Sequence, residues 1–408
     1  MRTRLLLALV TVLFAASQGG AQSPAPRRAI SDAEVMRVHR SMLLIDTHND
    51  VPSRTVEGFD IGSHTATGHT DIARLKEGGV GAQFFAVYVA AEYVKGNRSA
   101  NRTLQMIDTV RHDIIDRYPN DFMLATSARD IEEAHRRGKI AALMGIEGGH
   151  AIEDSLRLLR DYYDLGVRYM TLTHSNTNDW ADSSGDIDDP KVKHHDGLTD
   201  FGKQVVREMN RLGMMVDISH VADKTFWDAL EVSRAPIFAS HSSCRALTKH
   251  ARNMTDDMIV ALAKKGGVVQ VNFYCGFVSQ KFRDNDAADT KKLDAQMAKE
   301  TAGKNLSEPD RQILSENVRK ELGLSRATLS DVVDHIDHIR KIAGIDAIGI
   351  GGDFDGVSCT PIGLDDVSKY PNLTRALLER GYSTEDIRKI YGGNFLRVMR
   401  AVEAAAGK

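Results

Sequence analysis

The stretch Leu43-Leu-Ile-Asp46-Thr-His48-Asn-Asp50 decides how this sequence is read. Its first half, Leu43 to Asp46, is a short apolar run, and His48 and Asp50 follow directly. Residues two apart in an extended chain share a face, so these two side chains can converge on one metal ion. A buried strand that ends in polar, metal-ligating side chains indicates a parallel sheet with its chemistry at the carboxyl ends of the strands.

Seven further apolar runs follow along the 408-residue chain and alternate with longer amphipathic segments. One such segment has apolar residues at helical spacing from 198 to 212 and ends at Gly213. Most of the runs are apolar on both faces, as parallel strands covered on both sides are. The expected strands are Leu43–Asp46, Gly81–Val89, Ile140–Ile146, Tyr169–Thr173, Met214–Ile218, Ile237–Ser240, Val268–Phe273 and Ala347–Gly351. Eight strands with interposed helices predict an α/β fold, a (β/α)8 TIM barrel.

The alternative fold is a doubly wound open sheet. It would carry a glycine-rich phosphate loop after its first strand, and the residues from Asp46 to Asp50 are no such loop. From Gln280 to about Ser325 the chain is dense in Lys, Asp, Glu and Gln and contains no expected strand. We predict one catalytic domain over residues 41–403, with a charged helical excursion at about 280–325. The excursion is either a solvated decoration or a lid over the mouth of the barrel.

The amino terminus has the pattern of a secretory signal peptide. A basic start is followed by an apolar run from Leu5 to Ala16 and by small residues up to Ala21. The run is shorter than the ~20 residues that span a bilayer. We therefore expect cleavage near Ala21, a linker and lead-in over 22–40, no membrane span, and a periplasmic or secreted protein.

The composition is that of a globular protein with a substantial core, at 42% hydrophobic and 27% charged residues. A net charge of −3 argues against a nucleic-acid partner, because phosphate binding needs a basic surface. The three cysteines, Cys244, Cys275 and Cys359, allow at most one intramolecular disulfide. All three lie in or near strand-like segments, so we expect packed thiols rather than a disulfide. No Cys-x-x-Cys pair exists for a thiolate zinc site.

Six of the eight expected strands end in His, Asp or Glu. These residues are His48 and Asp50, Glu147, His174, His220, His241, and Asp353 with Asp355. One histidine at a strand end is usually a hydrogen-bonded loop residue, but six such strand ends together predict a metal site. Imidazole and carboxylate without thiolate suit zinc, with manganese or cobalt as substitutes.

Five candidate ligands are too many for one catalytic zinc that keeps an open position. They are His48, Asp50, Glu147, His220 and His241. This set predicts two zinc ions per chain, about 3.5–4 Å apart and bridged by a carboxylate. Glu147, which has glycine at 145, 148 and 149, is the expected bridge.

Taken together, the motifs resemble those of the membrane (renal) dipeptidase family from Ile45 to about Val398. The segments that carry the resemblance are Asp46-Thr-His-Asn-Asp50, Gly145-Ile-Glu-Gly148, Leu172-Thr-His174 with Trp180-Ala-Asp182, Val216-Asp-Ile-Ser-His220, Ser240-His-Ser-Ser243, Val271-Asn-Phe-Tyr274, and Gly351-Gly-Asp-Phe-Asp-Gly356 with Gly363-Leu-Asp-Asp-Val. The resemblance implies a binuclear zinc hydrolase that cleaves free dipeptides and tolerates a D-residue at the C-terminal position. It also implies that a metal-activated hydroxide attacks the scissile carbonyl.

The resemblance further assigns roles to single residues. It implies that His48 and Asp50 hold one zinc, that His220 and His241 hold the other, and that Glu147 bridges them. His174 would contact the substrate carbonyl and stabilise the oxyanion, and Asp353 would carry the proton from the water to the leaving amine. Arg252 would pair with the terminal carboxylate of the substrate, a role that suits guanidinium, and Tyr274 would also bind substrate.

The cysteine positions depart from the disulfide arrangement of the mammalian enzymes, so neither a covalent dimer link nor a lipid anchor is implied. Assembly as a homodimer stays open. Two other functions also stay open: a related binuclear amidohydrolase acting on cyclic amides, lactones, β-lactams or phosphotriesters, and a non-catalytic metal-binding envelope protein. Arg252 argues against the first, because a carboxylate clamp has no use with an uncharged substrate. Asp353 argues against the second, because a binder needs no proton carrier.

Overall fold

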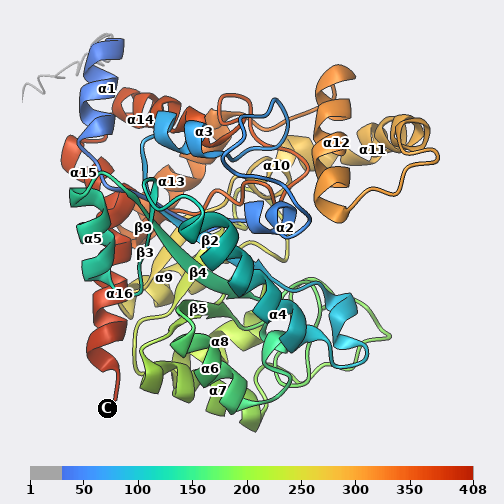
Figure 1. The fold of residues 1–408 in the computed structure, drawn as a ribbon, viewed down its shortest axis with the longest axis vertical. Coiled ribbons are helices and arrows are strands. Elements are labelled where there is room, and N and C mark those ends of the chain that lie inside the picture. Colours follow the sequence, from blue (N-terminus) through green and yellow to red (C-terminus); the bar gives the residue numbers. More distant parts are fainter. Residues whose placement is uncertain (1–29, 408) are drawn as a thin grey trace, which may run out of the picture.

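Eight parallel strands close into a barrel in the computed structural model, which describes residues 30–407 (Figure 1). The barrel strands are β1 (Leu44–Asn49), β2 (Val80–Tyr88), β4 (Ile140–Glu147), β5 (Val167–Thr171), β6 (Met215–Asp217), β7 (Phe238–Ser242), β8 (Val268–Val271) and β9 (Ile348–Ile350). Their order is β2-β1-β9-β8-β7-β6-β5-β4, and pairing of β2 with β4 closes the ring. The predicted (β/α)8 barrel is confirmed, and each expected strand overlaps one of these eight.

The β2–β4 pairing seals the barrel over a long register, from Ala82 opposite Ala141 to Tyr88 opposite Glu147. One further strand, β3 (Phe122–Leu124), was not predicted, and it pairs with the first residues of β4. This strand has three residues and is only partly buried. It therefore lacks the continuous apolar run by which the barrel strands were found.

Helices connect the strands and cover the outside of the barrel (Figure 1). The larger ones are α4 (Ser99–Asp108), α5 (Ala128–Arg136), α6 (Leu156–Asp164), α7 (Asp200–Leu212), α8 (Asp223–Val232), α9 (Asp256–Lys264), α13 (Leu329–Ala343), α14 (Tyr370–Glu379) and α16 (Asn394–Ala405). Helix α7 shows how the sequence sets their limits. Thr199 caps its first turn by accepting from the amide of Gly202, and Gly213 ends it in the left-handed conformation at φ 83°.

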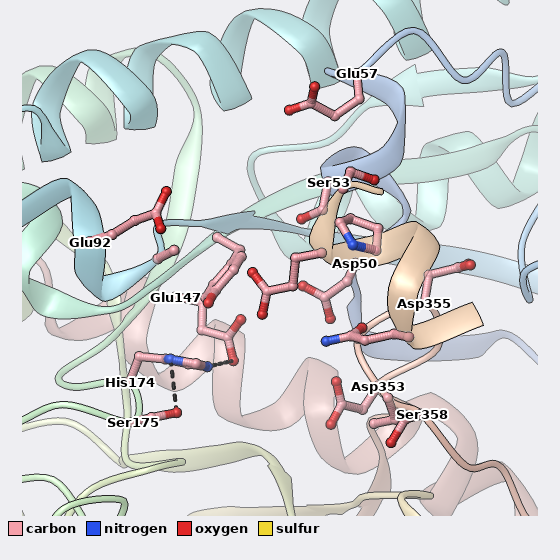
Figure 2. Close-up of a pocket in the computed structure, with 18 of the residues that line it drawn as sticks. Asp50, Ser53, Glu57, Glu92, Glu147, His174, Ser175, Asp353, Asp355 and Ser358 are labelled. Atoms are coloured by element: carbon pink, nitrogen blue, oxygen red, sulfur yellow. Dashed lines mark hydrogen bonds and ion pairs between the residues drawn. The ribbon is translucent and has the colours of Figure 1, made fainter. Parts of the chain in front are cut away.

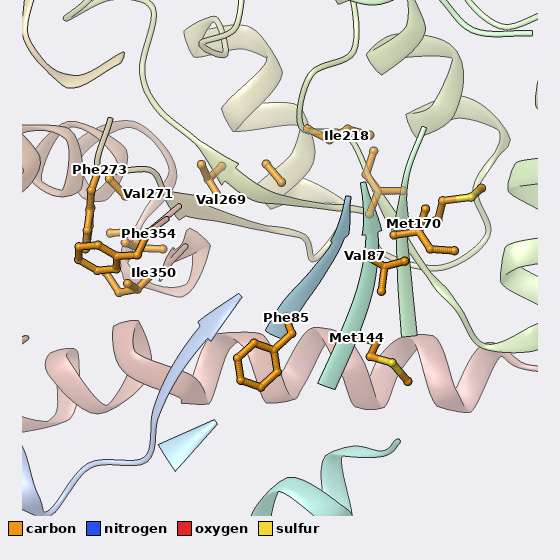
Figure 3. Packing of buried hydrophobic residues seen from close by; sticks show 14 of the residues in the cluster. Phe85, Val87, Met144, Met170, Ile218, Val269, Val271, Phe273, Ile350 and Phe354 are labelled. Carbon is orange, nitrogen blue, oxygen red and sulfur yellow. The ribbon is translucent and has the colours of Figure 1, made fainter. Parts of the chain in front are cut away.

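Apolar side chains on the outer face of the strands pack against the helices, among them Phe85 and Met144 (Figure 3). Inside the barrel, a second cluster contains Phe84, Tyr169 and Phe238 from three different strands and Phe395 from α16. The centres of neighbouring rings in this set are 5.1 to 6.0 Å apart. This aromatic layer fills the barrel beneath the strand ends that carry the polar residues.

The charged segment after β8 folds as α10 (Cys275–Val278), α11 (Gln280–Glu300) and α12 (Glu308–Glu321), and α11 and α12 stand out to one side of the barrel (Figure 1). A small cluster of Leu293, Val318 and Leu324 holds this excursion together. Buried contacts of Glu316 anchor α12 to the barrel: its carboxylate pairs with His69 and accepts the backbone N–H of Thr360 at 3.0 Å.

Cys275 and Cys359 form a disulfide, so the expectation of packed thiols was wrong for these two residues. The loops after β8 and β9 run side by side, with the amide of Cys275 donating to the carbonyl of Cys359 at 3.1 Å. This proximity arises only when the barrel closes, because 84 residues separate the two cysteines in sequence. Cys244 is a buried free thiol, as expected.

Within residues 30–407, the structure contains no helix long and apolar enough to cross a membrane. The predicted signal peptide lies outside the described residues, as do residues 22–29 of the predicted linker and lead-in. The end of the lead-in folds as α1 (Asp32–Arg40), capped by the side chain of Ser31.

Candidate metal centre

The carboxyl ends of the strands bring all five predicted metal ligands together at one mouth of the barrel. His48 lies in β1, Glu147 ends β4, and His241 lies in β7. Asp50 and His220 follow β1 and β6 within three residues. Three overlapping groups of potential ligand atoms result, and the atoms of each group lie within 4.8 Å of one another.

Glu147 lies between two sets of these side chains. Its Oε1 is 3.0 Å from Nε2 of His220 and 3.2 Å from Nε2 of His241. Its Oε2 is 3.5 Å from Nε2 of His48, and that nitrogen is 3.2 Å from Oδ2 of Asp50. The two oxygens of one carboxylate therefore face different pairs of ligands.

The chemistry of this donor set fits divalent cations. Nε2 of His48 and Oδ2 of Asp50 are buried and 3.2 Å apart, and neither has any other hydrogen-bond partner among the described residues. Leaving such atoms unpaired costs free energy that a bound ion would recover. Burial and nearby positive charge hold the pKa values of His220 and His241 well below the usual range, so both are the neutral imidazoles that bind metals.

Glu147 is the charged partner in the cluster. Burial acts to raise its pKa, but His48 and His174 and the hydrogen bonds with His220 and His241 hold it well below the usual range. The carboxylate is therefore ionised at neutral pH and available to one or two cations.

A second layer of side chains, which was not predicted, orients the histidines. Nδ1 of His48 lies 2.9 Å from the hydroxyl of Tyr169, which itself donates to the carbonyl of Thr47. The hydroxyl of Ser240 lies 2.7 Å from Nδ1 of His241 and donates to Asp217. Each Nδ1–H has an acceptor, so each Nε2 is left free toward Glu147. In the sequence, the one indication of this layer was Asp217, a carboxylate at the end of a short apolar strand.

Asp353 lies beside this cluster, with Oδ1 4.0 Å from Nε2 of His48. Its Oδ2 accepts a 2.7 Å hydrogen bond from the side chain of Asn272, a residue to which the sequence analysis gave no role. Burial, reinforced by the charges of Asp50 and Glu147, raises the pKa of Asp353 to about 8. The carboxyl can therefore hold a proton near neutral pH. Gly356 permits this packing, since a Cβ there would lie 2.2 Å from Asp50.

His174 lines the same cavity, with Nε2 3.9 Å from Oε1 of Glu147 (Figure 2). The hydroxyl of Ser175 lies 3.1 Å from its Nδ1. Burial lowers the pKa of His174, so the ring is neutral. Ser175 can donate to Nδ1, and this arrangement places the hydrogen of His174 on Nε2, toward the metal cluster.

The other two predicted substrate-binding residues, Arg252 and Tyr274, differ in position. Tyr274 lines the cavity, and its ring packs against Phe277 at 4.8 Å. Arg252 is buried and does not line it. Its guanidinium donates to Ser242 and to the carbonyl of His241, while its Nε is buried without a partner among the described residues. Phe277, whose ring centre is 5.5 Å from the guanidinium carbon, lines the cavity instead.

The cavity over the cluster has a volume of about 700 Å³. Its inner end is formed by Asp50, Glu147, His174, His220 and Asp353, and its outer wall includes residues 305–309 of the excursion. A pocket of this size fits a small organic substrate. A closed parallel barrel with buried histidines and carboxylates at the mouth defines a metal-dependent barrel hydrolase.

The chain belongs to the membrane dipeptidase family (peptidase family M19), whose model matches residues 32–408. It is therefore a member of a metallodipeptidase family. The probable dipeptidase PvdM from Pseudomonas aeruginosa is 27% identical with a TM-score of 0.76, over 92% of this chain and 99% of that one. Dipeptidase AC, a metallo peptidase, is 25% identical with a TM-score of 0.71, over 90% and 99%. A metallo peptidase from Rhodobacter sphaeroides, liganded with a phosphinate mimic of the dipeptide L-Ala-D-Ala, shares the fold at 24% identity, a TM-score of 0.70, and coverage of 88% and 99%.

Replacing Tyr169 by Phe should weaken metal binding by roughly tenfold to a hundredfold, because His48 loses the acceptor for its Nδ1–H. The aromatic ring that packs in the barrel is retained, so the protein should still fold. Competition with a chromophoric chelator measures the affinity. Tyr162→Phe is the matched control, since its buried hydroxyl donates to Ala151, away from the cluster. Unchanged affinity in Tyr169→Phe would show that this contact does not orient the ligand.

Proposed function

We propose that the protein is a zinc-dependent dipeptidase with two metal ions per chain. The observation that carries the proposal is the division of the Glu147 carboxylate, whose two oxygens face His220 and His241 on one side and His48 on the other. His48 and Asp50 would hold one ion, His220 and His241 the other, and Glu147 would bridge them. Membership of the family supports dipeptides as the substrates.

Two divalent ions, when bound, supply an activated water and polarise the scissile carbonyl. The residues of the chain then guide charge and protons. His174, with its hydrogen on Nε2, donates to the carbonyl oxygen as negative charge develops there. Asp353 accepts the proton of the attacking water and delivers it to the leaving amine. The carboxyl of Asp353 lies beside the ligand cluster, 4.0 Å from Nε2 of His48, where it can carry a proton between the water and the amine.

Arg252 and Tyr274 would recognise the end of the substrate that leaves. The unpartnered Nε of Arg252 is a donor still available to a carboxylate, and Tyr274 forms part of the cavity wall. A clamp on the free carboxylate would direct cleavage to the bond before the C-terminal residue. We also propose that the enzyme accepts a D-residue at the C-terminal position of the dipeptide.

Export to the periplasm or the medium is also part of the proposal. The amino-terminal pattern of residues 1–21 supports it, and so does the disulfide between Cys275 and Cys359. Disulfides form and persist in oxidising compartments and are rare in the cytosol.

Purified protein should hydrolyse L-Ala-L-Ala and L-Ala-D-Ala, lose this activity on chelation, and recover it when zinc is added back. The carboxyl-amidated dipeptide should be cleaved at least tenfold more slowly, because the carboxylate clamp has no partner. Both rates, for the free and for the amidated dipeptide, are measured by following the released amine by chromatography. Cleavage of lactones or cyclic amides with no dipeptide cleaved would instead identify a related amidohydrolase.

Asp353→Asn should retain both zinc ions and lose turnover on the order of a hundredfold to ten-thousandfold, because the amide cannot carry a proton. Metal content by mass spectrometry and kcat for L-Ala-L-Ala are measured on the same preparation. Asp188→Asn, an exposed residue outside the cavity, controls for the charge change. A normal kcat in Asp353→Asn would remove this residue from the mechanism.

A further inference from the structure

The outer part of the cavity carries a second group of carboxylates. Glu57 follows α2 (Val51–Thr55), Glu92 lies in the turn Ala91–Val94, and Glu308 begins α12 of the excursion. All three line the same cavity as the metal ligands. We call Glu57, Glu92 and Glu308 the acidic rim; Glu57 and Glu92 are labelled in Figure 2.

Only part of the negative charge of this rim is compensated by described residues. Two divalent ions bound at the cluster around Glu147 would neutralise the carboxylates of that cluster, which are not part of the rim. Arg102 is the one Lys or Arg side chain among the described residues that line the cavity, and it lies 3.8 Å from Glu57. No hydrogen bond or ion pair joins the carboxylates of Glu92 and Glu308 to another described residue. The rim therefore carries more negative charge than its surroundings balance.

Within the rim, the charge of Glu308 is close enough to interact with that of Glu92 and with the carboxylates of the metal centre. Burial, together with the charges of Glu92, Asp50 and Glu147, raises the pKa of Glu308. These groups interact across the cavity, in addition to contacting solvent at its mouth. A cation placed between them would relieve the repulsion.

A separate observation indicates a ligand at this place. The side chain of Ser53 lines the cavity, is 8% exposed, and has an Oγ without a hydrogen-bond partner among the described residues. Ser53 lies on α2, between the metal ligand Asp50 and the rim residue Glu57 (Figure 2). Its oxygen can accept from an N–H group of a bound molecule. Leu306 and Pro309 of the excursion add apolar surface along the same wall, which suits an alkyl stem.

We propose that the acidic rim binds the cationic side chain of a dipeptide substrate, an ammonium or guanidinium group at the end of an alkyl stem. This inference rests on the proposed function and names the substrate class of the same site. It also gives the excursion a role. Glu316 anchors α12 to the barrel through His69 and Thr360, and Glu308 begins the same helix.

The test compares lysine with its uncharged analogue norleucine, which has the same number of side-chain carbons. The zinc-loaded full chain is assayed with Lys-Ala and Nle-Ala, and with Ala-Lys and Ala-Nle. At one of the two positions, kcat/KM for the lysine dipeptide should exceed that for the norleucine dipeptide at least tenfold, mainly through KM. The preference should shrink as salt is added, because the rim is open to solvent.

The double substitution Glu92→Gln with Glu308→Gln should abolish this preference and leave the norleucine dipeptides unaffected. Glu321→Gln is the matched control, since it lies on the same helix α12, is exposed, and does not line the cavity. Its lysine preference should equal that of the wild type.

Equal rates for lysine and norleucine at both positions would overturn the inference while leaving the dipeptidase intact. A lysine preference that survives the double substitution would overturn it as well. If no dipeptide is cleaved under any condition, the proposed function itself fails, and the assignment of a substrate class to the rim fails with it.

Discussion

The site depends on one buried carboxylate that faces two sets of ligands. Glu147 occupies the last position of β4, opposite Tyr88 in the pairing that closes the barrel. Two residues earlier, Gly145 leaves room for Tyr169, because a Cβ there would lie 2.0 Å from its ring. Tyr169 in turn orients His48. The closure of the barrel, the aromatic layer inside it and the orientation of the ligands are therefore one connected arrangement around Glu147.

Much of this arrangement could be predicted from the sequence. Parallel strands covered on both faces are recognisable as continuous apolar runs, and all eight barrel strands were found in this way. In a barrel, the carboxyl ends of the strands converge. Side chains as far apart in sequence as His48 and Asp353 could therefore be placed together, and the structure brings Asp353 to 4.0 Å from His48. The family motifs pointed to the same residues.

The features that were missed depend on side-chain direction and on tertiary neighbours. Tyr169 looks like a core residue in sequence, and only the structure shows its hydroxyl at His48. The hydrogen bonds from the Arg252 guanidinium to Ser242 and to the carbonyl of His241 are likewise visible only in the structure. The Cys275–Cys359 disulfide joins two loops that are 84 residues apart in sequence and meet only in the folded barrel. The acidic rim also combines three distant segments, one of them from the excursion.

The most direct test of the account is the number and position of metal ions around Glu147. Anomalous diffraction from crystals grown with zinc, recorded above and below the zinc absorption edge, locates each ion. We expect two peaks, one contacting each oxygen of the Glu147 carboxylate, with His48 and Asp50 at one and His220 and His241 at the other. A single peak, or peaks that do not contact Glu147, would contradict the central claim.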